Sequence, residues 1–82
     1  MNPRVIDVKT LEGFRLLLTF SNGEKREFDM TPYLNTGVFK ELKDKQLFNT
    51  AKAFMGTVSW KNGQDLCPDT FWLDSIPVKN AG

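Results

Sequence analysis

Residues that commonly perform enzyme chemistry are few in this sequence, and histidine is absent from its 82 residues. Histidine is the commonest general base and metal ligand in proteins, and it is the usual partner of a serine or cysteine nucleophile. Without it, no nucleophile–base pair can be assigned along the chain. We therefore expect a protein that is not an enzyme and that needs no cofactor.

The single cysteine, Cys67, precedes Pro68 at the predicted start of a short helix. A helix N-terminus favours a thiolate, but no positively charged residue lies within five positions on either side of Cys67. We expect a small, partly buried and unreactive side chain. One cysteine cannot form an intramolecular disulfide, and the longest run of aliphatic residues is only Leu16–Leu18. These features predict a cytoplasmic protein that does not span a membrane.

Carboxylates concentrate in one region, at Asp65, Asp69 and Asp74. A hard cation needs several oxygen ligands converging from one loop, and this spacing lacks the repeated acids and the following glycine of an EF-hand. We expect Asp65 to accept backbone hydrogen bonds within its own turn. Asp69 should lie in the first turn of a helix, where the helix dipole favours negative charge. The sequence therefore predicts no metal site.

The adjacent aromatic residues Phe71 and Trp72 are the strongest candidates for partner binding. Neighbouring positions of a short helix cannot both face one core, so we expect one of these rings to be partly exposed. Tryptophan is enriched at interaction hot spots, and Asp69 and Asp74 would supply a polar rim. We predict that Trp72, with Phe71 or the two acids beside it, contacts a protein partner. The alternative is that Trp72 covers one end of the core.

The charges of the chain are nearly balanced, with eleven basic and ten acidic residues and a net charge of +1. A nucleic-acid-binding protein usually carries a basic excess, because phosphate neutralisation supplies much of its affinity. Residues 40–61 nevertheless contain five lysines against two acids. The five are Lys40, Lys43, Lys45, Lys52 and Lys61. They are either solvated side chains or a binding patch.

The first half of the chain has the pattern of β-strands. A strand is expected over residues 4–9. Within residues 14–20, Phe14, Leu16, Leu18 and Phe20 then recur at every second position, which is the period of a half-buried strand. Asn22-Gly23 follows, and this pair is a strong signal for a hairpin turn. The return strand, residues 24–30, is polar enough to be an edge strand that could pair with a partner.

The second half mixes short helices and strands. Thr31 is expected to cap a turn that begins at Pro32, and Asp44 to cap another after a helical segment at residues 38–43. These helical segments are short enough to be 3₁₀. Further expected elements are strands at 51–55 and 57–61 around Gly56, a turn at Asn62-Gly63, and a last short helix beginning at Pro68.

Together these elements predict one α+β domain over residues 1–78, followed by a frayed tail at 79–82. The expected architecture is a small, mainly antiparallel sheet of five or six strands, with two or three short helices packed on one face. The predicted core consists of Phe14, Leu16, Leu18, Phe20, Phe28, Leu42, Phe48, Val58 and Trp60.

The order of motifs resembles a known family. Phe20-Ser21-Asn22-Gly23, Phe28-Asp29-Met30, Gly37-Val38-Phe39 and a segment with the pattern Trp-x-Asn-Gly-x-Asp at residues 60–65 follow one another as in the small bacterial domain of unknown function 2442 family. That family has no established activity. Some longer relatives carry a helix-turn-helix domain after this one, and some are encoded beside another small protein in a toxin–antitoxin-like arrangement.

The resemblance implies an interaction or sensing module that binds an unidentified protein partner or forms a homodimer. The alternative is a nucleic-acid-associated component of a transcriptional regulator. The chain ends soon after the domain, so we expect no DNA-reading helix of its own.

Overall fold

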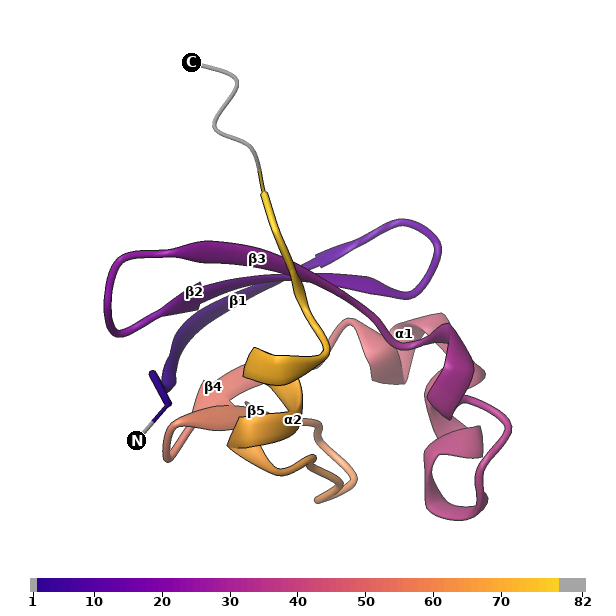
Figure 1. Ribbon diagram of the computed structural model, residues 1–82. Helices are drawn as coiled ribbons and strands as arrows, with labels where there is room; N and C mark the ends of the chain where they lie inside the picture. Colours follow the sequence, from indigo (N-terminus) through magenta and orange to yellow (C-terminus); the bar gives the residue numbers. More distant parts are fainter. Residues whose placement is uncertain (1, 79–82) are drawn as a thin grey trace.

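Three successive strands form an antiparallel meander that makes up most of the main β-sheet. The computed structural model describes residues 2–78. Strands β1 (Val5–Leu11), β2 (Arg15–Phe20) and β3 (Lys25–Asp29) pair in sequence order, and the two-residue strand β6 (Ile76–Pro77) adds to the far side of β3. The chain thus returns from its C-terminal part to complete a sheet that its N-terminal part began (Figure 1).

A second layer covers one face of this sheet (Figure 1). It contains a two-stranded hairpin and the helical segments. No helix among residues 2–78 is both long and apolar enough to cross a bilayer. Its elements are η1 (Thr31–Tyr33), η2 (Gly37–Lys43), α1 (Lys45–Phe48), β4 (Lys52–Phe54), β5 (Thr57–Ser59) and α2 (Pro68–Leu73).

The predicted α+β class, with an antiparallel sheet and short helices, is confirmed. The expectation of one sheet of five or six strands is wrong in one respect, because β4 and β5 form a separate two-stranded sheet. Their hairpin turns Val58 inward and lies across the main sheet. Each layer then buries its apolar face against the other, which a single extended sheet would not achieve.

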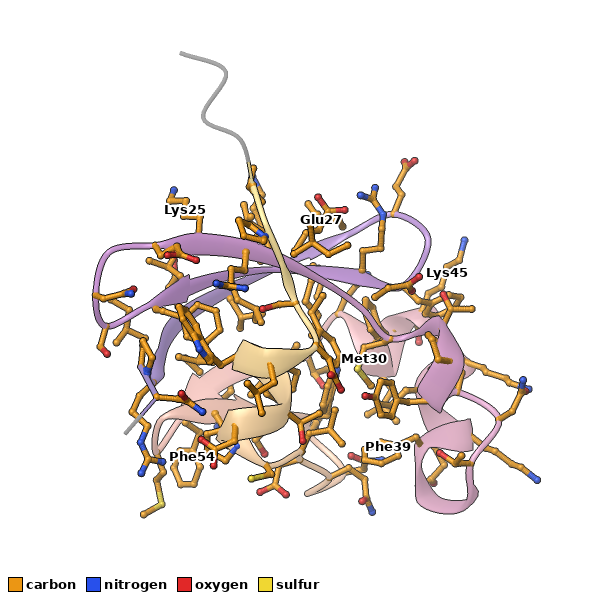
Figure 2. All side chains as sticks on the ribbon, in the orientation of Figure 1. Lys25, Glu27, Met30, Phe39, Lys45 and Phe54 are labelled. Carbon is orange, nitrogen blue, oxygen red and sulfur yellow. The ribbon has the colours of Figure 1, made fainter. Side chains whose placement is uncertain are left out.

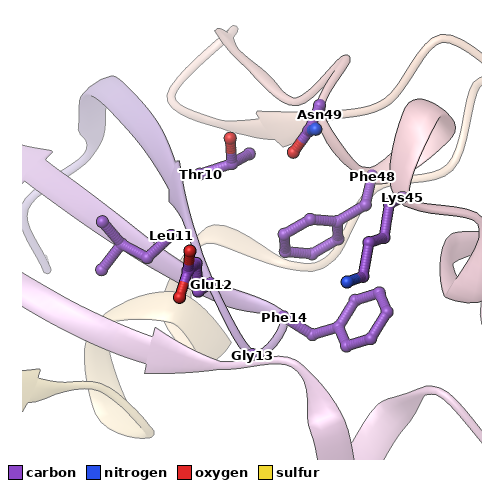
Figure 3. Close-up of a pocket in the computed structure, with 8 residues that line it drawn as sticks. All are labelled: Thr10, Leu11, Glu12, Gly13, Phe14, Lys45, Phe48 and Asn49. Carbon is purple, nitrogen blue, oxygen red and sulfur yellow. The ribbon is translucent and has the colours of Figure 1, made fainter.

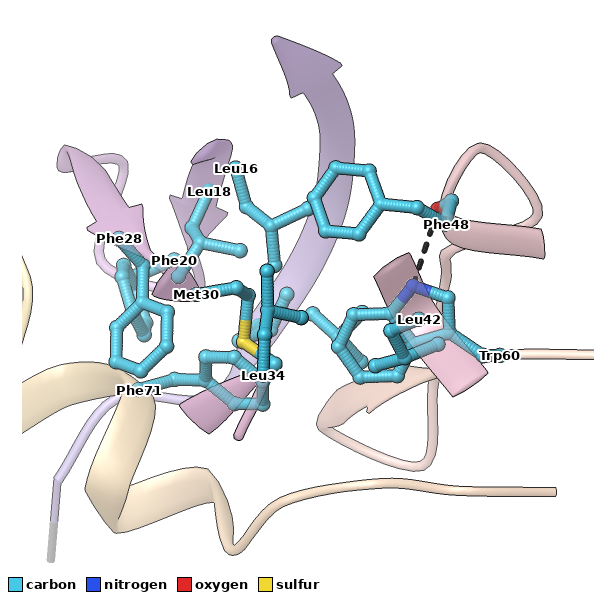
Figure 4. Packing of buried hydrophobic residues seen from close by; sticks show 12 residues of the cluster. Leu16, Leu18, Phe20, Phe28, Met30, Leu34, Leu42, Phe48, Trp60 and Phe71 are labelled. Atoms are coloured by element: carbon cyan, nitrogen blue, oxygen red, sulfur yellow. Dashed lines mark hydrogen bonds between the residues drawn. The ribbon is translucent and has the colours of Figure 1, made fainter. Parts of the chain in front are cut away.

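Apolar side chains from both layers meet in one core (Figure 4). Eight of the nine predicted core residues are buried, and Phe14 is half-buried. Phe14 lies in the β1–β2 turn with a positive φ of 58°, and its ring still packs edge-on against Phe48 at 5.2 Å. The core also contains Val5, Met30, Leu34 and Phe71.

The two Asn-Gly pairs form the same turn. Gly23 and Gly63 have φ values of 86° and 88°, which confirms the expected left-handed backbone. Each glycine N–H donates to the carbonyl oxygen of the aromatic residue three positions earlier, at 2.8 Å in both turns. The side-chain oxygens of Asn22 and Asn62 accept from the N–H two positions later, at 3.0 and 3.1 Å. Asparagine thus acts here through its side chain, and only glycine takes the positive φ.

Replacing Gly63 with alanine should lower the free energy of unfolding by about 1 kcal/mol, the order of the cost of placing an L-residue in the left-handed region. A Cβ atom at this position would meet no atom within 4 Å, so steric overlap adds nothing. Gly63→Asn is the matched variant and should cost less, because asparagine tolerates this conformation. Urea denaturation of the three proteins measures both differences, and equal losses in the two variants would contradict the backbone explanation.

Of the two predicted helix caps, one is confirmed and the other is wrong. The Asp44 side chain accepts from the N–H of Gln46 at 3.0 Å, as predicted. Thr31 does not cap its turn. The carboxylate of Asp29 accepts from the Thr31 N–H at 2.9 Å instead, because Thr31 already lies inside η1.

Strand β3 is not an edge strand, which corrects the sequence prediction. The N–H of Val78 donates to the carbonyl oxygen of Lys25 at 3.1 Å, and β6 pairs with Arg26 and Glu27. The polar pattern of β3 has another cause. Lys25 and Glu27 lie on the face of the sheet away from the second layer (Figure 2), where antiparallel sheets commonly meet solvent.

Candidate interaction surface

The carboxylate and thiol side chains among residues 2–78 do not gather into a metal-binding cluster. No group of three or more histidine, cysteine, aspartate or glutamate residues among residues 2–78 is placed to hold a metal ion. Cys67 is exposed, so the expectation that it is partly buried is wrong. It directly precedes α2 in an extended conformation, with φ −58° and ψ 135°, outside the packed turns of the helix.

Helix α2 divides its aromatic and aliphatic side chains between the core and the surface. Phe71 is fully buried and packs edge-on against Phe28, with ring centroids 4.8 Å apart. Trp72 is half-buried, and Leu73 is 69% exposed. The prediction that one of the two adjacent rings is partly exposed is confirmed, and that ring is Trp72. Phe71 offers no surface to a partner.

The Trp72 ring is held from two sides. It forms a T-shaped pair with Phe20 at a centroid distance of 5.0 Å, and the guanidinium carbon of Arg26 lies 3.8 Å from the Trp72 ring centroid. Arg26 also donates to the carbonyl oxygen of Ser75 at 3.2 Å and forms an ion pair with Glu24 at 2.6 Å. The ring therefore covers one end of the core, as the alternative interpretation expects. A partner contact at Trp72 stays a prediction.

Truncation of Trp72 to alanine should cost about 1–3 kcal/mol of unfolding free energy, from lost apolar burial and a lost cation–π contact. Arg26→Met, which retains an aliphatic stem, should remove only the smaller cation–π and polar contributions. Thermal unfolding of both variants measures the difference. If Trp72→Ala unfolds at the same temperature as the original protein, the ring does not serve the core and the partner-contact interpretation gains.

A hollow of about 650 Å³ lies where β6 meets η1 and the end of α2. Its lining includes Asp29, Tyr33, Asp74, Ile76, Pro77 and Val78, and we call it the β6 groove. Ile76 is 70% exposed and Val78 is 40% exposed. Leu73, beside Asp74 in the sequence, is another strongly exposed aliphatic residue. The groove is therefore bordered by aliphatic side chains that the core leaves in water.

Hydrogen bonds fix the polar groups of the β6 groove. The Tyr33 hydroxyl donates to Asp74 at 3.0 Å, while its ring stacks on Phe28 at 5.6 Å. Burial raises the pKa of Tyr33, and the hydrogen bond to Asp74 is the second-largest cause of the same shift. The Tyr33 hydroxyl therefore stays protonated and able to donate a hydrogen bond. Hydrogen bonds from Thr31 lower the pKa of Asp29, which stays charged at neutral pH.

The predicted site residues are only partly brought together. Asp74 lies in the β6 groove, but Asp69 lies in the first turn of α2 and accepts from the Asn2 amide at 3.3 Å. Neither Tyr33 nor Ile76 was predicted from the sequence to belong to a site. The Ile-Pro pair carried one usable signal, because a residue before proline favours an extended conformation and so a strand end.

The five lysines of residues 40–61 are all exposed. Lys40 and Lys43 lie on η2, Lys45 on α1 and Lys52 on β4, while Lys61 begins the second Asn-Gly turn. None of them lines the β6 groove. The lysines belong to several separate elements, and their binding-patch interpretation stays a prediction.

A second hollow, of about 630 Å³, lies between the β1–β2 turn and α1 (Figure 3). Phe14 and Phe48 form its aromatic wall, and Lys45, Asn49 and Glu12 contribute polar groups. None of the strongly exposed aliphatic side chains borders it. The β6 groove is therefore the better candidate for contact with another protein.

Comparison with known families identifies the chain. A model described as a protein of unknown function, DUF2442, matches residues 5–77. The chain belongs to the DUF2442 family. The match runs from β1 to β6 and so includes both layers, both Asn-Gly turns and every residue of the β6 groove except Val78. No curated protein and no solved structure matches the chain. The family resemblance of the sequence is thus confirmed.

Proposed function

We propose that this DUF2442 domain is a non-catalytic protein-interaction module that binds its partner through the β6 groove and the adjoining end of α2. One observation carries the proposal. Ile76, which is 70% exposed, lines the groove together with Asp74, whose carboxylate accepts from Tyr33, and the 69% exposed Leu73 directly precedes Asp74 in the sequence. Exposed aliphatic groups with polar neighbours are typical of a protein-binding surface. The partner would be a second small protein, as in a toxin–antitoxin-like pair, or a second copy of the chain.

Several side chains in and beside the groove are already held by contacts within the domain, which supports the proposal. Arg26 links β3 to Trp72 and to the carbonyl of Ser75, just before β6. The ring of Tyr33 is stacked on Phe28, beneath the groove. Side chains already held in one conformation lose little entropy when a partner docks, which supports tight binding from a modest area.

Side-chain docking is favoured over strand addition at this edge. Since Val78 bonds to Lys25, Arg26 and Pro77 form a non-hydrogen-bonded pair, and the Pro77 nitrogen faces away from β3. Proline has no N–H to offer an added strand at that position. The edge pairing expected for residues 24–30 is therefore replaced in our proposal by contact with the groove.

Ile76→Asp tests the proposal, because it places a charge in the centre of the proposed contact. Affinity capture from an extract of the source cells, with size-exclusion chromatography of the purified protein, should show the partner or dimer reduced roughly tenfold or more. Met55→Asp is the matched control. Met55 is also strongly exposed, in the β4–β5 turn, and aspartate tolerates its positive φ of 51°.

Equal loss in both variants, or retention in both, would contradict the assignment of the β6 groove. Circular dichroism establishes that each variant is folded. Retention on heparin or DNA that falls steeply with salt and survives Ile76→Asp would favour the nucleic-acid alternative instead.

A further inference from the structure

We propose that the β6 groove selects a basic segment of its partner, in which lysine or arginine side chains face Asp29 and Asp74 while an aliphatic side chain lies against Ile76. This inference rests on the proposed function and names the chemistry of the partner. The occupant is a basic segment of a separate protein.

Charge is the first argument. Around the groove, Glu27, Asp29 and Asp74 supply three carboxylates, and Arg15 supplies the one guanidinium. Arg15 is already engaged, because it forms an ion pair with Glu27. The lining thus carries a formal charge of two negative, although the whole chain carries +1. A local field opposite in sign to the net charge of the chain favours a cationic ligand and disfavours an anionic one.

The placement of the other two carboxylates, those of Asp29 and Asp74, is the second argument. Asp29 ends β3, while Asp74 directly follows α2, so the acids come from different elements that border the same groove. Tyr33 donates to Asp74 and packs its ring beneath the groove. Aliphatic surface at Ile76 and Pro77 lies with them in the same lining. A segment that alternates basic and aliphatic residues would match both the carboxylates and the aliphatic surface of the groove.

The backbone adds a third argument. In an antiparallel strand, the backbone N–H and C=O groups of every second residue point to the same side. The carbonyl oxygen of Lys25 points toward Val78, so the N–H of Asp29, four residues later in β3, points to that side too. Strand β6 pairs with Arg26 and Glu27 and stops before Asp29. An extended segment entering the groove could therefore accept a hydrogen bond from Asp29 as its side chains meet the acids.

Two short, capped peptides provide the probe, one alternating lysine with leucine and one alternating glutamate with leucine. Each is titrated into the ¹⁵N-labelled protein and followed by amide chemical shifts. The lysine peptide should shift the amides of Asp29, Tyr33 and Val78, and it should bind at least several-fold more tightly than the glutamate peptide. Binding should weaken as ionic strength rises, because exposed charges are screened.

Paired variants separate charge in the groove from charge elsewhere. The double variant Asp29→Asn with Asp74→Asn keeps side-chain oxygens that can accept from Thr31 and Tyr33. It should lower the affinity for the lysine peptide roughly 3- to 25-fold. Asp7→Asn with Asp69→Asn removes the same total charge outside the groove and should leave that affinity within about twofold.

Each remaining outcome overturns the inference. It fails if the glutamate peptide binds equally well, if neither peptide shifts the groove amides, or if the two double variants lose affinity equally. These failures are distinct from failure of the proposed function, which is decided by partner or dimer retention in Ile76→Asp. A partner lost in that variant, with no preference for the lysine peptide, leaves the interaction module standing and rejects a basic ligand.

Discussion

Trp60→Ala is expected to leave most of the protein unfolded at ambient temperature. Trp60 is 1% exposed, and its indole N–H donates to the carbonyl oxygen of Phe48 at 3.0 Å (Figure 4). Truncating a buried tryptophan costs about 3–5 kcal/mol, and leaving a buried carbonyl without its donor adds about 1–3 kcal/mol. The total free energy of unfolding of a domain of this size is roughly 4–12 kcal/mol. Far-UV circular dichroism in a urea series measures the loss.

Trp60→Phe separates packing from hydrogen bonding at the same position. Phenylalanine retains an aromatic ring but cannot donate to Phe48, so we expect a folded protein that is destabilised by about 1–3 kcal/mol. If Trp60→Ala were as stable as Trp60→Phe, packing of the ring would contribute nothing to stability, which would contradict its burial in the core. If Trp60→Phe were as stable as the original protein, the hydrogen bond to Phe48 would contribute nothing.

Leu18→Ala should cost about 2–5 kcal/mol, the second-largest effect of a single substitution that we predict. Leu18 is fully buried in the centre of β2, between β1 and β3, where neighbouring strands cannot move to fill a cavity. The thermal midpoint should fall by many degrees, because a small domain has a small unfolding entropy.

Leu17→Ala is the control on the adjacent position of the same strand. Leu17 faces the other side of the sheet and is only half-buried, paired across the strands with Lys9 and Glu27. We expect the free energy of unfolding to fall by about 1 kcal/mol or less, because the substitution removes little buried apolar surface. An unchanged midpoint in Leu18→Ala, or a larger loss in Leu17→Ala, would mean that the inward face of β2 has been misassigned.

The sequence by itself determined the local structure of much of the chain. The alternation of residues 14–20 fixed which face of β2 is buried, because side chains in a strand alternate between two faces. Both Asn-Gly turns followed from the few residues that adopt a positive φ readily. The Asp44 cap followed from the four unpaired N–H groups at a helix start. These features depend on neighbouring residues, so they could be derived without knowing the rest of the fold.

Only the tertiary structure decided the features of the candidate site. Residues distant in sequence, Asp29, Tyr33 and Ile76, form one groove because β6 returns to pair with β3. A two-residue strand has no periodicity to predict its partner, and β3 therefore resembled an edge. The choice between Phe71 and Trp72 for the core depended on where α2 docks. Burial depends on the position of other elements in space, which no local pattern in the sequence records.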